Sequence, residues 1–167
     1  ATLSSNTLTF ARTVDGVASA AQTITLTNSG NAPLTSVALT LSGANAADFT
    51  FTSTCGSSLA AGQACSIAVT FKPSLPADEG ATLSLASNAP GSPASVALSG
   101  IGAAPDFYIT TPSTSASVTA GTPAIYNLMI QTDPGLTGTA TLACSGLPAY
   151  AACTFAPANV SLTGTAT

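Results

Sequence analysis

The clearest pattern in the chain is the alternation of hydrophobic and hydroxyl side chains in residues 21–27, which read AQTITLT. One face of an extended strand here carries Gln22, Ile24 and Leu26, and the other carries Thr23, Thr25 and Thr27. A period of two with β-branched residues predicts a half-buried strand. The next residues, NSGNAPL at 28–34, predict a turn, because Asn and Gly tolerate left-handed backbone.

The unit of strand, polar turn and strand recurs through the first half of the chain. Together with residues 21–27, alternating runs predict strands at 7–10, 37–41, 49–52, 66–71, 82–85 and 95–100. Turn signals rich in Gly, Asn, Pro and Asp separate them, and no stretch has a convincing helical period. Seven strands at this spacing are typical of an immunoglobulin-like β-sandwich.

The same alternation of hydrophobic and hydroxyl residues resumes after residues 103–105. These read AAP and predict a short linker whose proline restricts rotation. Further strands are expected at 106–110, 117–119, 124–130, 138–144, 153–155 and from 159 onward. The predicted fold class is therefore all-β, with two immunoglobulin-like β-sandwich domains in tandem. Their boundaries are 1–102 and 106–167.

Charge and hydropathy limit the kinds of partner that the chain is expected to bind. Charged residues make up 5% of the 167, and the two cations cannot form the basic surface that nucleic acid or an anionic membrane requires. Thr, Ser, Gly and Pro interrupt every apolar run before it reaches the ~20 residues of a membrane-spanning helix. The first residues already have strand character, so we interpret the chain as mature or trimmed, without a signal peptide.

The four cysteines form two close pairs, Cys55 with Cys65 and Cys144 with Cys153, each within one predicted domain. With no His in the chain and no zinc-knuckle spacing, a zinc site is not expected. Two local disulfides made in an oxidising compartment are the favoured interpretation. Reduced cysteines that pack as small hydrophobic residues are the alternative.

Two family resemblances rest on specific stretches. Residues 1–102 resemble the ASH-like repeats of bacterial secreted proteins, through AAQTITLTNSGNAPL, TCGSSLAAGQACSIAVTFKP and SNAPGSPASVALSGIG. Residues 106–167 resemble the immunoglobulin-like repeats that often follow them, through SVTAGTPAIYNLMI, GTATLACSGLPAYAACTFAP and NVSLTGTAT. The resemblance implies extracellular adhesive or structural modules with no catalytic residues and no cofactor.

The second resemblance also implies one more strand after the NVSLTG segment. If the subunit ends at Thr167, the second domain lacks that strand and exposes an edge at Asn159, Val160, Ser161 and Leu162. An unpaired edge is a template for strand pairing, so a neighbouring copy is expected to fill it and form a head-to-tail filament. A trimmed chain or a disordered tail is the alternative.

Catalytic and metal-binding groups are sparse. Without His, a Ser or Cys nucleophile lacks its usual general base. Asp78 and Glu79 are adjacent in a predicted turn, so we expect two solvated charges rather than an acid–base pair or, with Asp106, a calcium site. A Lys72–Asn cross-link assisted by Glu79 is disfavoured, because Lys72 precedes Pro73 at an expected exposed strand end.

The sequence therefore predicts a non-catalytic extracellular protein, a subunit of a bacterial surface filament or the stalk of an adhesin, which associates with itself and binds no metal. The alternative is a glycan- or receptor-binding module of a larger secreted protein. Glycan binding would need an aromatic platform, for which Tyr108, Tyr126 and Tyr150 are candidates, although packing within strands is their expected role. Residues 159–161, NVS, also form an N-glycosylation sequon.

Overall fold

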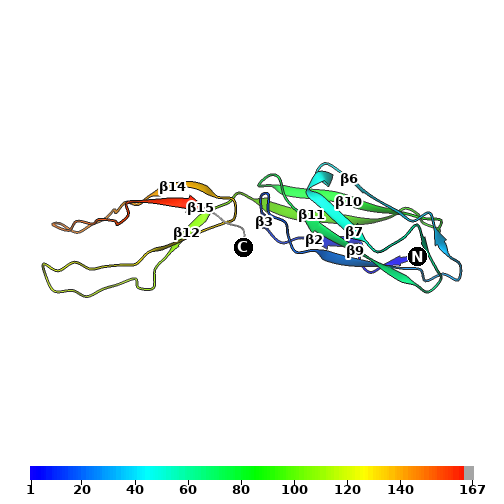
Figure 1. The fold of residues 1–167 in the computed structure, drawn as a ribbon, viewed down its shortest axis with the longest axis horizontal. Helices are drawn as coiled ribbons and strands as arrows, with labels where there is room; N and C mark the ends of the chain where they lie inside the picture. The colour runs from blue at the N-terminus through cyan, green and yellow to red at the C-terminus, as the bar shows by residue number, and fades with distance from the viewer. Residues whose placement is uncertain (164–167) are drawn as a thin grey trace. The chain divides into compact units, whose positions relative to one another are not determined.

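Two compact units make up the protein, Ala1–Ala104 and Pro105–Thr167. The structure is a computed structural model that describes residues 1–163 (Figure 1). Almost all of its regular structure is β-strand, so the predicted all-β class is confirmed. A single 3₁₀ turn, η1 (Ala46–Asp48), interrupts the strands among the described residues.

Two sheets form the sandwich of the first unit. The first sheet has the order β1-β4-β9-β7 and is antiparallel, with strands β1 (Thr2–Leu3), β4 (Gln22–Thr27), β9 (Ala64–Phe71) and β7 (Phe49–Ser53). The second has the order β2-β11-β10-β6, with strands β2 (Thr7–Thr9), β11 (Ala94–Ala103), β10 (Asp78–Ala86) and β6 (Ala38–Ser42). Short β3 (Thr13–Val14) lies beside β11, and β5 (Leu34–Thr35) pairs with β8 (Ser58–Leu59).

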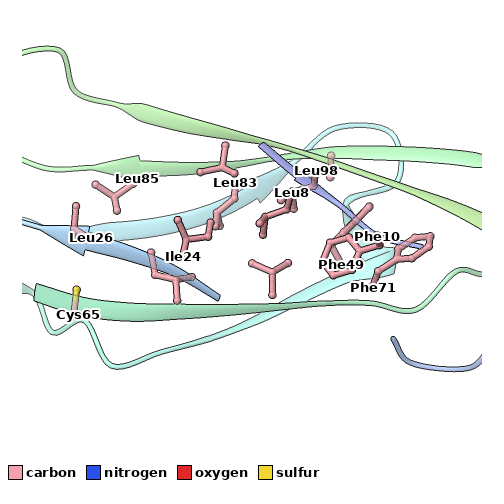
Figure 2. Close-up of a cluster of buried hydrophobic side chains, with 14 of the residues drawn as sticks. Leu8, Phe10, Ile24, Leu26, Phe49, Cys65, Phe71, Leu83, Leu85 and Leu98 are labelled. Atoms are coloured by element: carbon pink, nitrogen blue, oxygen red, sulfur yellow. The ribbon is translucent and has the colours of Figure 1, made fainter. Parts of the chain in front are cut away.

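The alternation read from the sequence decides which side chains form the core of this unit. Along β4, Ile24 and Leu26 are buried while the threonines between them are more exposed, and β9 and β11 alternate in the same way. Figure 2 shows side chains from both sheets meeting between the layers. At one end of the core, Phe49 stacks on Phe71 with ring centroids 4.9 Å apart, and Phe10 packs against both at 5.8–5.9 Å.

Asn28 organises the turn that follows β4. Its side chain is buried, donates to the carbonyl oxygens of Ala32 and Leu59 at 2.9 Å each, and accepts the Gly30 N–H at 3.1 Å. The turn predicted at residues 28–34 is therefore held against the loop between the first two cysteines. Both the oxygen and the nitrogen of this buried amide have hydrogen-bond partners, as a buried polar group requires.

The predicted linker begins inside a strand. β11 continues through Gly102 and Ala103, which pair with Thr13 and Val14 of β3. The N–H of Gly102 also donates to the Ala77 carbonyl at 2.8 Å. Residues 102 and 103 therefore belong to the first unit. Both are buried, and two neighbouring segments pair with their backbone groups.

The second unit is much less regular than predicted. Its described strands form two separate two-stranded sheets, β12 (Phe107–Thr110) with β13 (Met129–Thr132), and β14 (Thr137–Thr141) with β15 (Asn159–Thr163). Strands expected at 117–119 and 153–155 are absent from the described residues, and the one expected at 124–130 starts only at Met129. These segments have no neighbouring strand to complete a ladder, and an isolated strand is not stable by itself.

Candidate functional site

The strand edge expected at residues 159–162 lies in β15. This strand pairs with β14 from Thr141 opposite Asn159 to Thr137 opposite Thr163, and the Thr141 hydroxyl donates to Asn159 Oδ1 at 2.9 Å. Leu162 is buried and Val160 half-buried, whereas Asn159 and Ser161 are exposed. Within the described residues β15 has no second neighbour, so its other edge presents unpaired backbone groups.

Large apolar side chains of the same unit are also exposed. Ile125 is 80% exposed, Met129 57% and Ile109 47%. On β12 and β13, Ile109 lies opposite Ile130, so the two isoleucines share one face of this pair. Leu162 is the one buried hydrophobic residue of the unit among those described, so the unit as it stands covers little of its apolar surface.

Both cysteine pairs are joined as disulfides. Cys55 and Cys65, with Cα atoms 5.1 Å apart, close the loop before β9, and Cys65 belongs to the buried core. Cys144 and Cys153, with Cα atoms 6.5 Å apart, close a loop of the second unit, and both residues are exposed. Disulfides of this kind form and persist in oxidising compartments.

The expectation that Asp78 and Glu79 are both solvated turn charges is wrong for Glu79. Both residues belong to β10, and Glu79 is 4% exposed on the inward face that continues through Ala81 and Leu83. Burial, followed by the hydrogen bond and the charge of Asp48, raises the pKa of Glu79. The signal that sequence reasoning missed was the period of two, which extends backward from Leu83 to Glu79.

The other polar candidates do not gather into a reaction centre. Lys72 is exposed at the end of β9, as expected. In the second unit, Asp133 Oδ2 accepts the Asp106 N–H at 3.1 Å and Asp106 Oδ1 accepts the Phe107 N–H at 2.7 Å, so both carboxylates hold backbone groups. The described residues contain no group of three His, Cys, Asp or Glu side chains that could hold a metal ion.

A surface cavity of about 460 Å³ lies at the N-terminal end of the first unit. It is lined by β1, the residues after it and the turn at 87–95, and its polar side chains are hydroxyls and an amide. No acidic or basic side chain belongs to its lining, which is entirely within the described part of the chain. General acid–base chemistry needs a titratable side chain within hydrogen-bond reach of the substrate, and this lining offers none.

The three tyrosines are exposed, contrary to the expectation that they pack within strands. Tyr108 is 55% exposed and Tyr126 45% exposed, and Tyr150 is fully exposed with a left-handed φ of 66°. Tyr108 lies on β12, whereas Tyr126 and Tyr150 lie in irregular segments. The sparse core of this unit offers their rings nothing to pack into.

Comparison with known proteins yields similar structures without a family. No family model matches the chain, and no curated protein matches its sequence. The VesB protease of Vibrio cholerae is similar over 60% of this chain and 31% of its own, with a TM-score of 0.49 and 22% identity. An ASH/PapD-like domain of human CEP192 is similar over 62% of this chain and 84% of its own, with a TM-score of 0.49 and 16% identity.

The secreted serine protease VesC of Vibrio cholerae is similar over 60% of this chain and 22% of its own, with a TM-score of 0.40 and 18% identity. The chain thus corresponds to less than a third of the length of either protease. The immunoglobulin-like description of the first unit stands on its own two sheets and its register. None of the helices in the described residues is long and apolar enough to cross a membrane.

Proposed function

We propose that the chain is a non-catalytic structural module of an extracellular protein, and that it belongs to a bacterial surface filament or adhesin stalk. Copies join by β-strand addition at the edge of β15. The observation that carries this proposal is that β15 leaves one edge unpaired within the described residues while its unit leaves large apolar side chains exposed. A strand added there would pair the free backbone groups of β15.

We propose a second copy of this chain as the source of the added strand. The described strands combine hydroxyl and aliphatic side chains and carry charge only at the first residues of β10. Such a strand meets the uncharged edge of β15 without desolvating an ion. Proteins that avoid pairing commonly place a charge, a Pro or a bulge on an edge strand, and β15 reads NVSLT, with none of these side chains.

Self-association is tested with a charge placed on this edge. The full chain is examined by size-exclusion chromatography with light scattering and by electron microscopy over a range of concentrations. Wild type is expected to form head-to-tail oligomers, and Ser161→Lys to need about tenfold more protein for the same degree of association, because a lysine on an edge strand opposes pairing.

Ser99→Lys is the matched control, since Ser99 is exposed on β11 and is paired on both sides, with Gly80 of β10 and Thr9 of β2, so no edge is free there. This variant should associate as wild type does. A monodisperse, folded wild-type monomer at every concentration would show that copies do not join by strand addition. If that monomer also bound glycans on an array, the module would be a glycan-binding one, and the exposed tyrosines would be the first residues to substitute.

A further inference from the structure

Glu79 is the one charged side chain that is buried among the residues described. Its Oε1 accepts the Leu75 N–H at 3.3 Å and so holds the loop between β9 and β10. Its Oε2 is fully buried and has no hydrogen-bond partner. A carboxylate buried with one unpartnered oxygen is costly, because burial removes solvation of its charge and backbone N–H donation to the carboxylate compensates only part of that loss.

A second carboxyl group, that of Asp48, lies within hydrogen-bond reach of the Glu79 side chain. Asp48 ends η1, which is fastened to β10 because Asn45 donates to the Gly80 carbonyl at 3.4 Å and accepts the Gly80 N–H at 3.2 Å. The Asp48 carbonyl accepts the Lys72 N–H at 2.7 Å, so the residue that follows β9 also holds Asp48 in place. Two deprotonated carboxylates offer only acceptors to each other, so a proton on one of them is what allows a hydrogen bond.

We propose that Glu79 retains a proton and donates it through Oε2 to the Asp48 carboxylate, and that this shared proton fastens η1 and the loop at 72–77 to β10. The loop in turn touches the end of β11, since the Ala77 carbonyl accepts the Gly102 N–H at 2.8 Å. The shared proton therefore stabilises the end of the sandwich that contains the C-terminal end of β11. No activity of the chain is involved, and the proposal is independent of strand addition.

The other charged groups near this end of the sandwich do not share the proton of Glu79 and Asp48. Lys72, at the end of β9, and Asp78, beside Glu79 on β10, are both exposed. Asp15, after β3, turns its buried Oδ1 to Gly102. β11 carries no charged residue. Asp48 is thus the charged group that acts on Glu79, and with burial it raises the pKa of Glu79 above its ordinary 4.5.

The sign of the pH dependence follows from this direction. A group whose pKa is higher in the folded chain stabilises the fold fully below its unfolded pKa, and this contribution is lost as the pH rises through the folded value. Between the two values, the folded chain holds a proton that the unfolded chain has released. The unfolding equilibrium constant of the first unit should therefore rise with pH in that interval, by at most about tenfold per pH unit for this one proton.

The test is urea unfolding of the full chain from acidic to alkaline pH, for wild type, Glu79→Gln and the matched control Asp78→Asn. The glutamine amide donates to Asp48 at every pH and its oxygen still accepts from Leu75, so Glu79→Gln should abolish the rise. Asp78→Asn should keep it, because Asp78 is exposed. A rise that is equal in wild type and Glu79→Gln would overturn the proposal.

A second measurement keeps the proposal testable if Glu79→Gln does not fold. The side-chain carboxyl carbon of Glu79 is followed by ¹³C NMR in the wild-type chain, and it should titrate above its ordinary value of 4.5. Titration at or below that value would contradict a retained proton. Stabilisation of wild type by CaCl₂ at alkaline pH, lost in Glu79→Gln, would also overturn it and assign a cation to the two carboxylates.

Discussion

At the scale of single residues, Asn28 and Glu79 carry the polar structure inside the first unit. They are the two buried polar or charged side chains among those described. Each holds a loop to the sandwich through backbone groups, Asn28 by the Ala32 and Leu59 carbonyls and Glu79 by the Leu75 N–H. The sequence predicted a turn at Asn28, because Asn suits turns, but the distant acceptor, the Leu59 carbonyl, depends on how the chain folds.

Asn28→Asp should destabilise the first unit. The substitution keeps the size of the side chain but removes both donated hydrogen bonds and places a carboxylate beside two carbonyl oxygens. The loss should be about 2–4 kcal/mol, measured by urea unfolding followed by circular dichroism. Asn31→Asp is the control, because Asn31 is exposed in the same turn. Equal losses in the two variants would mean that the buried hydrogen bonds contribute nothing.

At the scale of elements, the strands of the first unit follow from the alternation, whereas the fit between strands does not. The seven predicted strands appear as β2, β4, β6, β7, β9, β10 and β11. Gly100 reads from the sequence as the end of a strand, yet β11 continues past it to Ala103, and Gly100 lies opposite Glu79 within the β10–β11 ladder. Its missing side chain leaves room for the ring of Phe71, which a Cβ at this position would overlap.

Gly100→Ala should therefore destabilise the sandwich by about 1–3 kcal/mol through overpacking. The Phe71 ring belongs to the stacked aromatic cluster, so it cannot move without disturbing Phe49. Gly56→Ala is the matched control, since a Cβ there meets no atom closer than 3.8 Å. Thermal unfolding of both variants measures the difference. A smaller loss for Gly100→Ala than for Gly56→Ala would show that the ring adapts freely.

The two disulfides should differ in how fast they are reduced in the folded chain. Cys65 is buried in the core and Cys55 is half-buried, whereas Cys144 and Cys153 are exposed. Attack by a thiolate requires access to the sulfur, so dithiothreitol should open the second disulfide first. Timed alkylation and mass spectrometry of the peptides measure the order. Reduction of Cys55–Cys65 before or together with Cys144–Cys153 would contradict the burial seen here.

At the scale of the whole molecule, the scarcity of charge determines how the protein responds to solution conditions. Eight charged residues contribute a net charge of −4 over 167 residues. The two units therefore depend on apolar burial, hydrogen bonds and disulfides, and salt screens none of these strongly. The same scarcity leaves the edge of β15 without a charge that would oppose pairing.

Salt should accordingly have little effect on either stability or self-association. Raising NaCl from about 0.05 M to about 0.5 M shortens the Debye length roughly threefold, yet the melting temperature should shift by no more than about 2 °C. The degree of association in light scattering should stay the same or rise, since apolar contacts are not weakened. A large fall in association with salt would mean that ion pairs, rather than strand addition, join the copies.

The sequence by itself determined the all-β class, the strands of the first unit and the faces they bury, because a period of two assigns each side chain to one face of a sheet. Tertiary structure alone decided the rest. The folding of the chain placed Asp48 beside the inward-facing Glu79, brought Gly100 against Phe71, and left the apolar residues of the second unit exposed. These features depend on which distant segments become neighbours, and that is set by the packing of the whole chain rather than by local alternation.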